Sequence, residues 1–460
     1  MKITEILNIK FNYQMTESLL ALLFDEEKRN AAFEQYLATN PDLSQDCFLA
    51  EFQAQFADRS GLKQDYTPSS ICRILADISG KAESVLDVCS GTGALTLAKW
   101  AQCKTAKFYC EEYSKEAVAI LLFNLALRGI NAEVRHGDVL TGETFTGYRL
   151  TNQGKFSHIE EVALDWSGLK VDCVISNPPY SLGWQPKEDE RFQGYALAPK
   201  SKADYAFVLH GLHYLKPNGT ASFILPHGVL FRGQGEGKIR QQLIEEQRLN
   251  SVIGLPEKLF LATSIPTCIL TFKPNSQNVW ICDASELREP QPKINIMNDS
   301  HIKAVIDAYR QRQTVERLAN VVSLAELKEN DFNLNIPRYV DTFVAEDVPD
   351  LLETARELLQ LTKEADEAGR QFVAMMNELQ MPNGSAREQA EFAEAKRIMQ
   401  QVFAPRDYET SFIEKISTVD YLPLFTTEEI EKIQGFIEMT EKKIEQLKAV
   451  KNYFTSKMFV

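Results

Sequence analysis

The stretch VDCVISNPPYSLGW, residues 171–184, joins an apolar run to an amide, two prolines and an aromatic ring. The side-chain oxygen of Asn177 accepts hydrogen bonds. Pro178 and Pro179 hold the backbone stiffly, because their rings fix φ and remove the N–H donors. The carbonyl oxygen of Pro178 is therefore a second fixed acceptor, and Tyr180 offers a ring on which a planar base can stack. Two acceptors beside an aromatic ring suit an –NH₂ group on a planar base.

This arrangement favours methyl transfer to the exocyclic amine of adenine. That amine is conjugated with its ring and is a poor nucleophile, and hydrogen bonds from both of its protons would favour a more pyramidal nitrogen. Its lone pair would then point at a sulfonium methyl group, so that much of the catalysis is positioning, with no metal and no covalent nucleophile. A proline turn that ends a strand is the ordinary alternative, and the tetrapeptide alone does not separate the two.

A glycine turn upstream has the pattern of a ligand-binding loop. Residues 84–100, SVLDVCSGTGALTLAKW, read as a strand, a turn at Gly91, Thr92 and Gly93, and a helix. The turn lacks the third glycine of a dinucleotide-binding loop and the lysine of a triphosphate-binding loop. Asp87 before the turn adds a negative charge, which favours a cation over a phosphate. These features fit S-adenosylmethionine, which carries adenine, a ribose and positive charge but no phosphate.

Acidic residues end the next two predicted strands. AKFYCEEYS ends in Glu111 and Glu112, where a carboxylate suits the ribose diol. The following strand ends at HGDVL, which places Asp138 where it can accept from the adenine amino group. Strands that alternate with helical segments form βα crossovers, and open α/β sheets bind ligands at the carboxyl ends of their strands. The sequence therefore predicts a mostly parallel, Rossmann-like sheet with helices on both faces and the site at one edge.

The chain of 460 residues is long for one domain. Residues 1–60 read as an N-terminal helical region, residues 61–340 as the α/β domain, and residues 341–460 as an acidic helical region. The last of these ends in a coiled-coil pattern, with residues alternately three and four apart from Ile430 to Phe454 that are apolar except for Thr440. This pattern predicts that the C-terminal helices pack against a partner's helices or a second copy.

Composition and net charge limit the classes of protein to which the chain can belong. There is no apolar run long enough for a membrane span and no signal-peptide pattern, so we expect a cytoplasmic protein. The eight cysteines form no CxxC pair and the six histidines no constellation, so no metal site is expected, and His210 and His213 read as structural. The net charge is −14, whereas proteins that grip DNA unaided usually have a basic surface. Nucleic-acid binding would thus require a basic partner or a local basic patch.

From about Gly61 to Tyr339 the chain resembles class-γ amino-methyltransferases that act on DNA adenine, and more narrowly the modification subunits of type I restriction–modification systems. The stretches QDYTPSSICRILADI, LDVCSGTGALTLA, FYCEEYSKEAVAILLFNLALRGI and NPPYSLGW carry the resemblance, as does the whole of residues 224–272. It implies these cofactor-binding residues: Tyr66, Thr67, Pro68, Asp87, Ser90, Gly91, Thr92, Gly93, Glu112 and Asp138. Glu112 aligns better than Glu111. The implied catalytic residues are Asn177, Pro178, Pro179 and Tyr180.

The resemblance has further implications. Related enzymes stack a second aromatic ring on the flipped base opposite the tyrosine, and Phe260 is the matching position; a core phenylalanine is the alternative. Expected partners are double-stranded DNA, a specificity subunit and a restriction subunit. The N-terminal region is short for the family, and the last residues look more like the closing helix of a specificity subunit. Two rival functions stay open: methylation of another planar amine (cytosine N4, an RNA base or a protein glutamine) on the same fold, or a catalytically silent assembly subunit.

Overall fold

The structure is a computed structural model that describes residues 3–7, 14–46, 48, 51–52, 67–260, 263, 265–342, 351–378 and 385–402. The chain divides into two compact units, Met1–Phe343 and Val344–Val460. The first unit contains the glycine turn and the NPPY stretch. The second contains the acidic helices.

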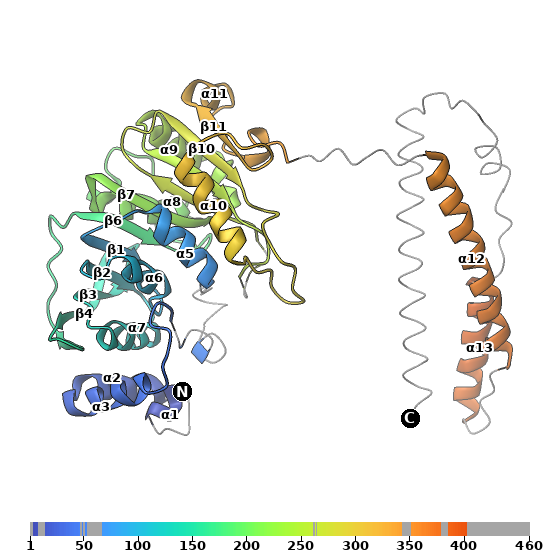
Figure 1. The fold of residues 1–460 in the computed structure, drawn as a ribbon, viewed down its shortest axis with the longest axis horizontal. Coiled ribbons are helices and arrows are strands. Elements are labelled where there is room, and N and C mark those ends of the chain that lie inside the picture. The colour runs from blue at the N-terminus through green and yellow to red at the C-terminus, as the bar shows by residue number, and fades with distance from the viewer. Residues whose placement is uncertain are drawn as a thin grey trace. The chain divides into compact units, whose positions relative to one another are not determined.

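One sheet forms the centre of the first unit (Figure 1). Its described strands are β1 (Ser84–Val88), β2 (Lys107–Glu112), β3 (Ala132–Asp138), β4 (Glu143–Asn152), β5 (Ser157–Glu161), β6 (Val171–Ser176), β7 (Leu215–Pro226), β8 (Leu249–Gly254), β9 (Thr267–Phe272), β10 (Asn278–Asp283) and β11 (Ala319–Ser323). Their order across the sheet is β11-β10-β8-β9-β7-β6-β1-β2-β3-β4-β5. The four strands that precede the predicted site residues are therefore neighbours, in the order β6-β1-β2-β3.

The central part of the sheet is parallel, whereas the outer part is mostly antiparallel, with β8 and β10 as a parallel pair. Strands β7, β6, β1, β2 and β3 each run parallel to their neighbours in this series, as the alternation of apolar runs and helical segments predicts. The pairs β3–β4, β4–β5, β7–β9, β8–β9 and β10–β11 are antiparallel, so the prediction of a mostly parallel sheet is wrong for these outer pairs. Short connections explain part of this difference. Only residues 139–142 join β3 to β4, and a chain that turns back so soon pairs antiparallel.

Helices cover both faces of the sheet, which is why its central strands are apolar on both sides. In β1, Val85 belongs to one hydrophobic core and Leu86 to the other, and Cys173 and Val174 in β6 divide in the same way. The helices on the Val85 side are α5 (Ser69–Ile78), α6 (Ala94–Gln102), α7 (Lys115–Leu127) and α10 (Asp299–Gln311). Those on the Leu86 side are α8 (Asp204–Tyr214), α9 (Gln234–Glu245) and α11 (Leu324–Glu329). Short 3₁₀ helices within the described residues are η2 (Glu190–Phe192), η3 (His227–Leu230) and η4 (Ile336–Arg338).

The N-terminal helices share the core of the first unit. They are α1 (Ile3–Leu7), α2 (Met15–Phe24) and α3 (Glu26–Leu37). Helix α2 contacts α7, and the ring of Phe33 in α3 meets Phe123 in α7 edge-on, with the ring centroids 4.8 Å apart. Arg128, just after α7, donates to the carbonyl oxygens of Leu43 and Gln45 at 2.8 Å each. The segment after α3 is thus fastened to the helix that follows β2.

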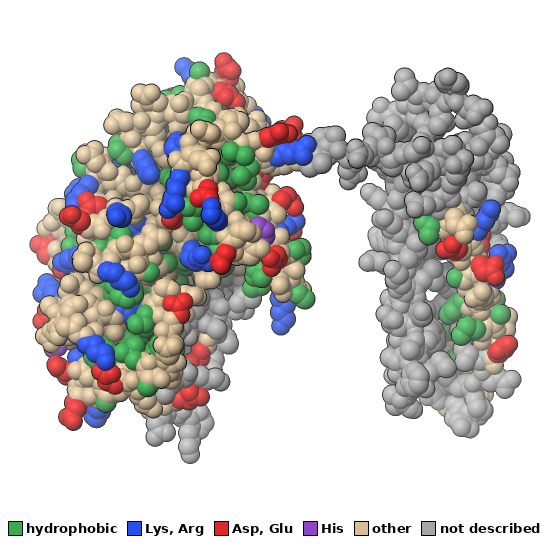
Figure 2. All heavy atoms as spheres, in the orientation of Figure 1, with side chains coloured by type: hydrophobic (Ala, Val, Ile, Leu, Met, Phe, Trp, Pro, Cys, Tyr) green, Lys and Arg blue, Asp and Glu red, His purple; other side chains and the backbone are tan. Residues whose placement is uncertain are grey.

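In the second unit, α12 (Leu351–Glu378) and α13 (Ala386–Val402) contact each other and are helical, as the sequence predicts. The predicted coiled-coil segment at the end of the chain lies outside the described residues. None of the described helices combines the length and the apolar composition that a transmembrane span requires. On the face of the first unit drawn in Figure 2, basic and acidic side chains are interspersed, and among the described residues neither kind forms a continuous patch there.

Candidate active site

A cavity of about 440 Å³ lies at the carboxyl edge of the central strands. Residues that follow β6, β1, β2 and β3 line it, and because these strands are parallel their carboxyl ends meet at this one edge. Nine of the residues proposed from the sequence are among those lining it: Thr67, Ser90, Gly91, Glu112, Asp138, Asn177, Pro178, Pro179 and Tyr180. Residues far apart in the sequence are thus collected around a single hollow.

The glycine turn after β1 requires backbone conformations that glycine adopts without strain. Cys89, Gly91 and Gly93 are in the left-handed region, with φ of 59°, 56° and 98°. A Cβ on Gly93 would also come within 2.8 Å of the Leu121 side chain in α7. Both the conformation and the packing therefore select glycine at position 93. The N–H of Gly91 donates to the Glu112 carboxylate at 2.8 Å, so the turn and the end of β2 form one wall of the cavity.

Glu112 presents a fixed carboxylate to the cavity. Its two oxygens accept the backbone N–H groups of Gly91 and Ser114, each at 2.8 Å. Burial raises the pKa of Glu112, and these N–H groups partly offset the effect. An acidic group held in this way suits hydrogen bonds to two ribose hydroxyls. The adjacent Glu111 points to the opposite face, where it meets His210, as the alternation of side chains along a strand requires.

Asp138 organises the loop that forms the next wall. Its Oδ1 accepts the N–H of Leu140 at 2.8 Å, and its carbonyl oxygen accepts the N–H of Gly142 at 2.8 Å. Val139, Leu140 and Thr141 line the cavity beside it. We call residues 138–141 the adenine-side loop, because the sequence predicts the adenine contact at Asp138.

The amide of Asn177 is held from two sides at the cavity. Its Nδ2 donates to Thr67 Oγ1 at 2.9 Å, and its Oδ1 accepts from the Tyr180 hydroxyl at 2.7 Å. Thr67 immediately precedes Pro68, the N-cap residue of α5, so a residue assigned to the methionine end of the cofactor also contacts the amide. The two contacts fix the direction of the amide. A base that enters beside Tyr180 would share or replace the hydroxyl contact to Oδ1.

The two aromatic residues proposed to stack on the base are in contact with each other. The rings of Tyr180 and Phe260 are nearly perpendicular, at 88°, with centroids 6.0 Å apart. Phe260 is 4% exposed and belongs to the hydrophobic core of the Val85 face. A base stacked between these rings would have to separate them.

Replacing Phe260 by alanine tests these alternatives. If Phe260 stacks on an extruded base, the variant should methylate its target at least roughly tenfold more slowly, because aromatic stacking contributes substantially to holding a base. A mismatch opposite the target lowers the cost of extrusion and should partly restore the rate. The measurement is methyl transfer to matched and mismatched duplexes that contain the host's methylated site. A variant that melts at a lower temperature but keeps its specific activity would favour a core role.

Four of the residues proposed from the sequence are not among those that line the cavity. Pro68 occupies the position before α5 and Gly93 the position before α6. The hydroxyl of Thr92 donates to Asp46, so Thr92 faces the N-terminal segment. Asp87 is fully buried in β1 and accepts a hydrogen bond from Thr96. Tyr66 lies outside the described residues.

Asp87 carries less charge than the sequence suggests. Burial, together with the nearby charge of Glu112, raises the pKa of Asp87 to about 7, although the hydrogen bond from Thr96 lowers it. The carboxyl group is therefore partly protonated at neutral pH. Within the described walls of the cavity, the acidic side chains are Glu112 and Asp138.

This raised pKa predicts a pH dependence of stability. Because folding raises the pKa of Asp87, the protonated form is favoured in the folded state, and the contribution of this group to stability falls as the pH rises from about 4 towards 7. Asp87→Asn is close in shape and stays neutral. The difference in melting temperature between Asp87→Asn and wild type should therefore increase by a few degrees from pH 5 to pH 8, in favour of the variant, because a small change in stability shifts the melting temperature by about that much. If the melting temperatures of the two proteins change with pH in the same way over this range, Asp87 is ionised throughout.

The walls of the cavity fit S-adenosylmethionine better than a phosphate-containing ligand. Among the described residues that line it, two are carboxylates and none is lysine, arginine or histidine. A phosphate would lack a cationic partner there, whereas a sulfonium and an amine would meet negative charge. Among the described residues, no group of three or more His, Cys, Asp or Glu side chains is arranged to hold a metal ion.

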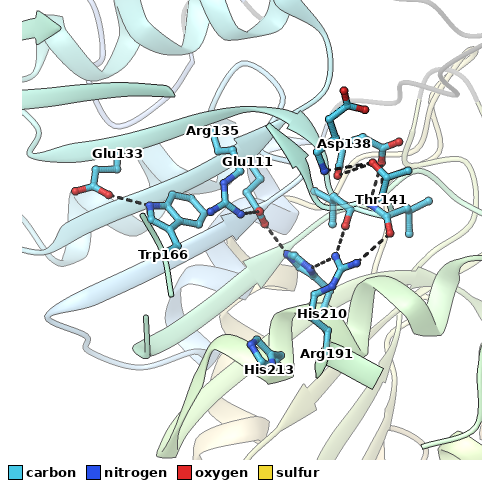
Figure 3. Close-up of polar contacts among 12 residues, drawn as sticks. Glu111, Glu133, Arg135, Asp138, Thr141, Trp166, Arg191, His210 and His213 are labelled. Atoms are coloured by element: carbon cyan, nitrogen blue, oxygen red, sulfur yellow. Dashed lines mark hydrogen bonds and ion pairs between the residues drawn. The ribbon is translucent and has the colours of Figure 1, made fainter. Parts of the chain in front are cut away.

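Sequence reasoning missed a buried ionic cluster behind the adenine-side loop (Figure 3). His210 and Glu111 are each 2% exposed and lie 2.7 Å apart, and Arg191 donates to the other ring nitrogen of His210 at 3.0 Å. A histidine within the apolar run ADYAFVLHGL was the available signal, since a buried imidazole needs polar partners.

Comparison with known proteins identifies the family. Residues 45–348, well over half of the chain, match the family model described as N-6 DNA methylase. The chain belongs to this family. The resemblance drawn from the motifs is thereby confirmed, and the family implies S-adenosylmethionine as the cofactor.

Several relatives of the family are similar to this chain. The methylase subunit of the type I restriction enzyme MpnII from Mycoplasma pneumoniae is 30% identical over 317 residues, which cover 64% of this chain and 56% of that protein. The HindI methylase subunit from Haemophilus influenzae is 26% identical over 347 residues, which cover 69% of this chain and 72% of that protein. The crystal structure of the type I restriction-modification system methyltransferase subunit from Streptococcus thermophilus aligns with a TM-score of 0.57 and 33% identity, covering 65% of this chain and 63% of that one. This similarity confirms the predicted methyltransferase fold. The chain spans about half the length of the Mycoplasma subunit.

Proposed function

We propose that the protein transfers a methyl group from S-adenosylmethionine to the exocyclic amine of adenine within a specific DNA sequence, as the catalytic subunit of a type I-like modification system. The observation that carries this proposal is the amide of Asn177, held by Thr67 and Tyr180 at the cavity that Glu112 also lines. Its place in the N-6 DNA methylase family supports the same reaction.

Each wall of the cavity has a distinct role in binding the cofactor. The Glu112 carboxylate would accept the ribose hydroxyls, and the adenine-side loop would receive the adenine. The backbone at Ser90 and Gly91, with Thr67, would surround the methionine end. When bound, the cofactor supplies an electrophilic methyl group. The chain's contribution is to fix its orientation and to surround its positive charge with carboxylates.

Asn177 and the prolines would hold the target. The amine's two hydrogens would be accepted by Asn177 Oδ1 and the Pro178 carbonyl oxygen, which turns the nitrogen lone pair towards the methyl group. Pro179 keeps this backbone stiff, and Tyr180 provides the stacking surface. Positioning of this kind lowers the barrier without a covalent intermediate on the protein.

A direct test uses the chain as it is assembled in its host. The tagged protein, isolated with its bound partners, would be incubated with methyl-labelled S-adenosylmethionine and with DNA, RNA or host protein. We expect label in DNA alone. Label in RNA or in protein glutamine would overturn the proposal, and normal cofactor binding with label in none of the three would favour a silent assembly subunit.

We also propose that DNA binding depends on partners. The net charge of −14 and the interspersed surface charges argue against unaided binding, because phosphate contacts supply much of the affinity for DNA. The apolar seam of residues 427–460 would pack on the helices of a specificity subunit or a second copy, and a restriction subunit would complete the system. The three-part division at residues 60 and 340 and the cytoplasmic location stand as predictions with this proposal.

Deleting residues 427–460 tests the partner proposal. The deletion should abolish the complex in size-exclusion chromatography, because the seam would lose its partner helices, while cofactor affinity stays unchanged. If the full-length chain alone remains monomeric and methylates a defined site at normal rates, the partner proposal is wrong.

A further inference from the structure

Arg191 occupies the centre of the buried cluster behind the adenine-side loop (Figure 3). Its side chain is only 8% exposed. All five of its N–H donors have acceptors. Nε and Nη2 donate to the Asp189 carboxylate at 3.0 and 2.6 Å, and Nη2 also donates to the carbonyl oxygen of Leu140 at 3.1 Å. Nη1 donates to the carbonyl oxygen of Val139 and, at 3.0 Å, to Nδ1 of His210.

The contacts of His210 define its tautomer. A guanidinium group only donates, so Nδ1 must accept from Arg191, and the ring hydrogen lies on Nε2. Nε2 then donates to Glu111 at 2.7 Å, and Glu111 also accepts from Arg135 at 3.2 Å. Burial alone would raise the pKa of Glu111, but the hydrogen bond from His210 and the positive charge of Arg135 lower it, which favours the carboxylate form. The end of β2 thus anchors His210, which in turn orients the plane of the Arg191 guanidinium.

Arg191 comes from a segment that begins directly after the catalytic stretch. Residues 182–203, which we call the strap, leave the sheet after Tyr180 and return to α8. The two ends of the strap are paired: Ala203 N–H donates to the Leu182 carbonyl oxygen and Trp184 N–H to the Lys200 carbonyl oxygen, each at 2.8 Å. Leu182 and Trp184 line the cavity, whereas Arg191 lies farther along the strap, in η2.

One side chain therefore joins two walls of the cavity. The strap continues the loop that carries Asn177, and the adenine-side loop receives the cofactor. The carbonyl oxygens of Val139 and Leu140, which Arg191 holds, belong to residues that line the cavity themselves. A shift of the guanidinium would move the adenine-side loop and the strap apart.

We propose that Arg191 is a positioning residue that locks the adenine-side loop to the strap, so that cofactor binding and placement of the target amine depend on one buried guanidinium. The inference rests on the proposed function. It adds a residue that touches neither the cofactor nor the base but sets the spacing between their two sites.

The test compares Arg191→Met and Arg191→Lys with a matched control. Arg240 is also buried, at 5% exposed, and donates to three backbone carbonyl oxygens, those of Val229, Arg232 and Phe332. Arg240→Met should lower the melting temperature without affecting the cavity, because none of these four residues lines it. The readouts are affinity for S-adenosylhomocysteine by calorimetry, kcat for methylation, and the melting temperature, with binding and rates measured well below melting.

We expect Arg191→Met to weaken S-adenosylhomocysteine binding about tenfold and to lower kcat by a further factor of about ten, since hydrogen bonds from a charged group are lost. The affinity and kcat of Arg191→Lys should fall between those of Arg191→Met and wild type, because an ammonium keeps the positive charge but lacks the planar set of N–H donors of a guanidinium. Arg240→Met should change neither quantity. The proposal is overturned if the Arg191 variants lower the melting temperature but bind and turn over like wild type; if Arg191→Met does not fold, Arg191→Lys decides.

The binding readout keeps this proposal separate from the proposed function. S-adenosylhomocysteine affinity does not depend on which macromolecule is methylated. A wild-type protein that binds this ligand but never labels DNA would contradict the proposed function. Unchanged ligand affinity in Arg191→Lys and Arg191→Met would contradict only the positioning role of Arg191.

Discussion

Replacing Asn177 by alanine is expected to lower the rate of methyl transfer by roughly three orders of magnitude or more, because in the proposed mechanism the lost acceptor would contact the reacting amine itself. The cavity walls formed by Glu112 and the adenine-side loop remain in place. Affinity for S-adenosylmethionine, measured by calorimetry, should therefore stay within a few-fold of wild type. The fall should appear in kcat rather than in the KM for the cofactor.

A matched variant separates this effect from general damage. Asn295 is also largely buried and donates to the carbonyl oxygen of Glu257 at 2.8 Å, and neither residue lines the cavity. Asn295→Ala should lose some stability and keep its turnover. Near-normal turnover in Asn177→Ala, with cofactor bound, would mean that the amide does not hold the target amine.

Replacing Glu112 by alanine should weaken cofactor binding by a factor of roughly ten to a hundred, since the proposed hydrogen bonds from the ribose to a charged acceptor would be lost. The change also leaves the N–H groups of Gly91 and Ser114 without their acceptor, so Glu112→Gln, which keeps an acceptor oxygen without the charge, should lose less affinity. Calorimetric titration with S-adenosylhomocysteine measures both variants.

Glu133→Gln provides the control for this experiment. Glu133 is a buried acid on the neighbouring strand β3, where it accepts hydrogen bonds from Lys107 at 2.9 Å and Trp166 at 2.8 Å and does not line the cavity. Its variant should bind the ligand normally. Unchanged affinity in Glu112→Ala would remove Glu112 from the ribose site and, with it, the assigned orientation of the cofactor.

The central strands and the cavity could be predicted from the sequence because local patterns determine them. The apolar run VDCVIS coincides with β6 and AEVRHGD with β3, and each ends at a residue that lines the cavity or directly precedes one. The positive φ values of Gly91 and Gly93 explain why the turn needs glycine. Parallel strands with covered faces then bring the acidic strand ends and Asn177 to the same edge.

Other features depend on contacts between distant segments, which no local pattern reports. The hydrogen bond from Asn177 to Thr67 joins residues 110 positions apart, and that between His210 and Glu111 joins residues 99 apart. The depth of Asp87, which raises its pKa to about 7, depends on the helices packed over β1. Strand β9 pairs antiparallel between β7 and β8, a placement that its apolar sequence TCILTF does not encode, because such a run is equally suited to a parallel strand.

The most direct test of the account is to identify the methylated base. Genomic DNA from the host, with the gene present and with the gene deleted, would be digested to nucleosides and analysed by mass spectrometry. The account predicts N6-methyladenine that disappears on deletion and does not return when the gene is restored as Asn177→Ala. N4-methylcytosine in its place, or N6-methyladenine that is unchanged by the deletion, would contradict it.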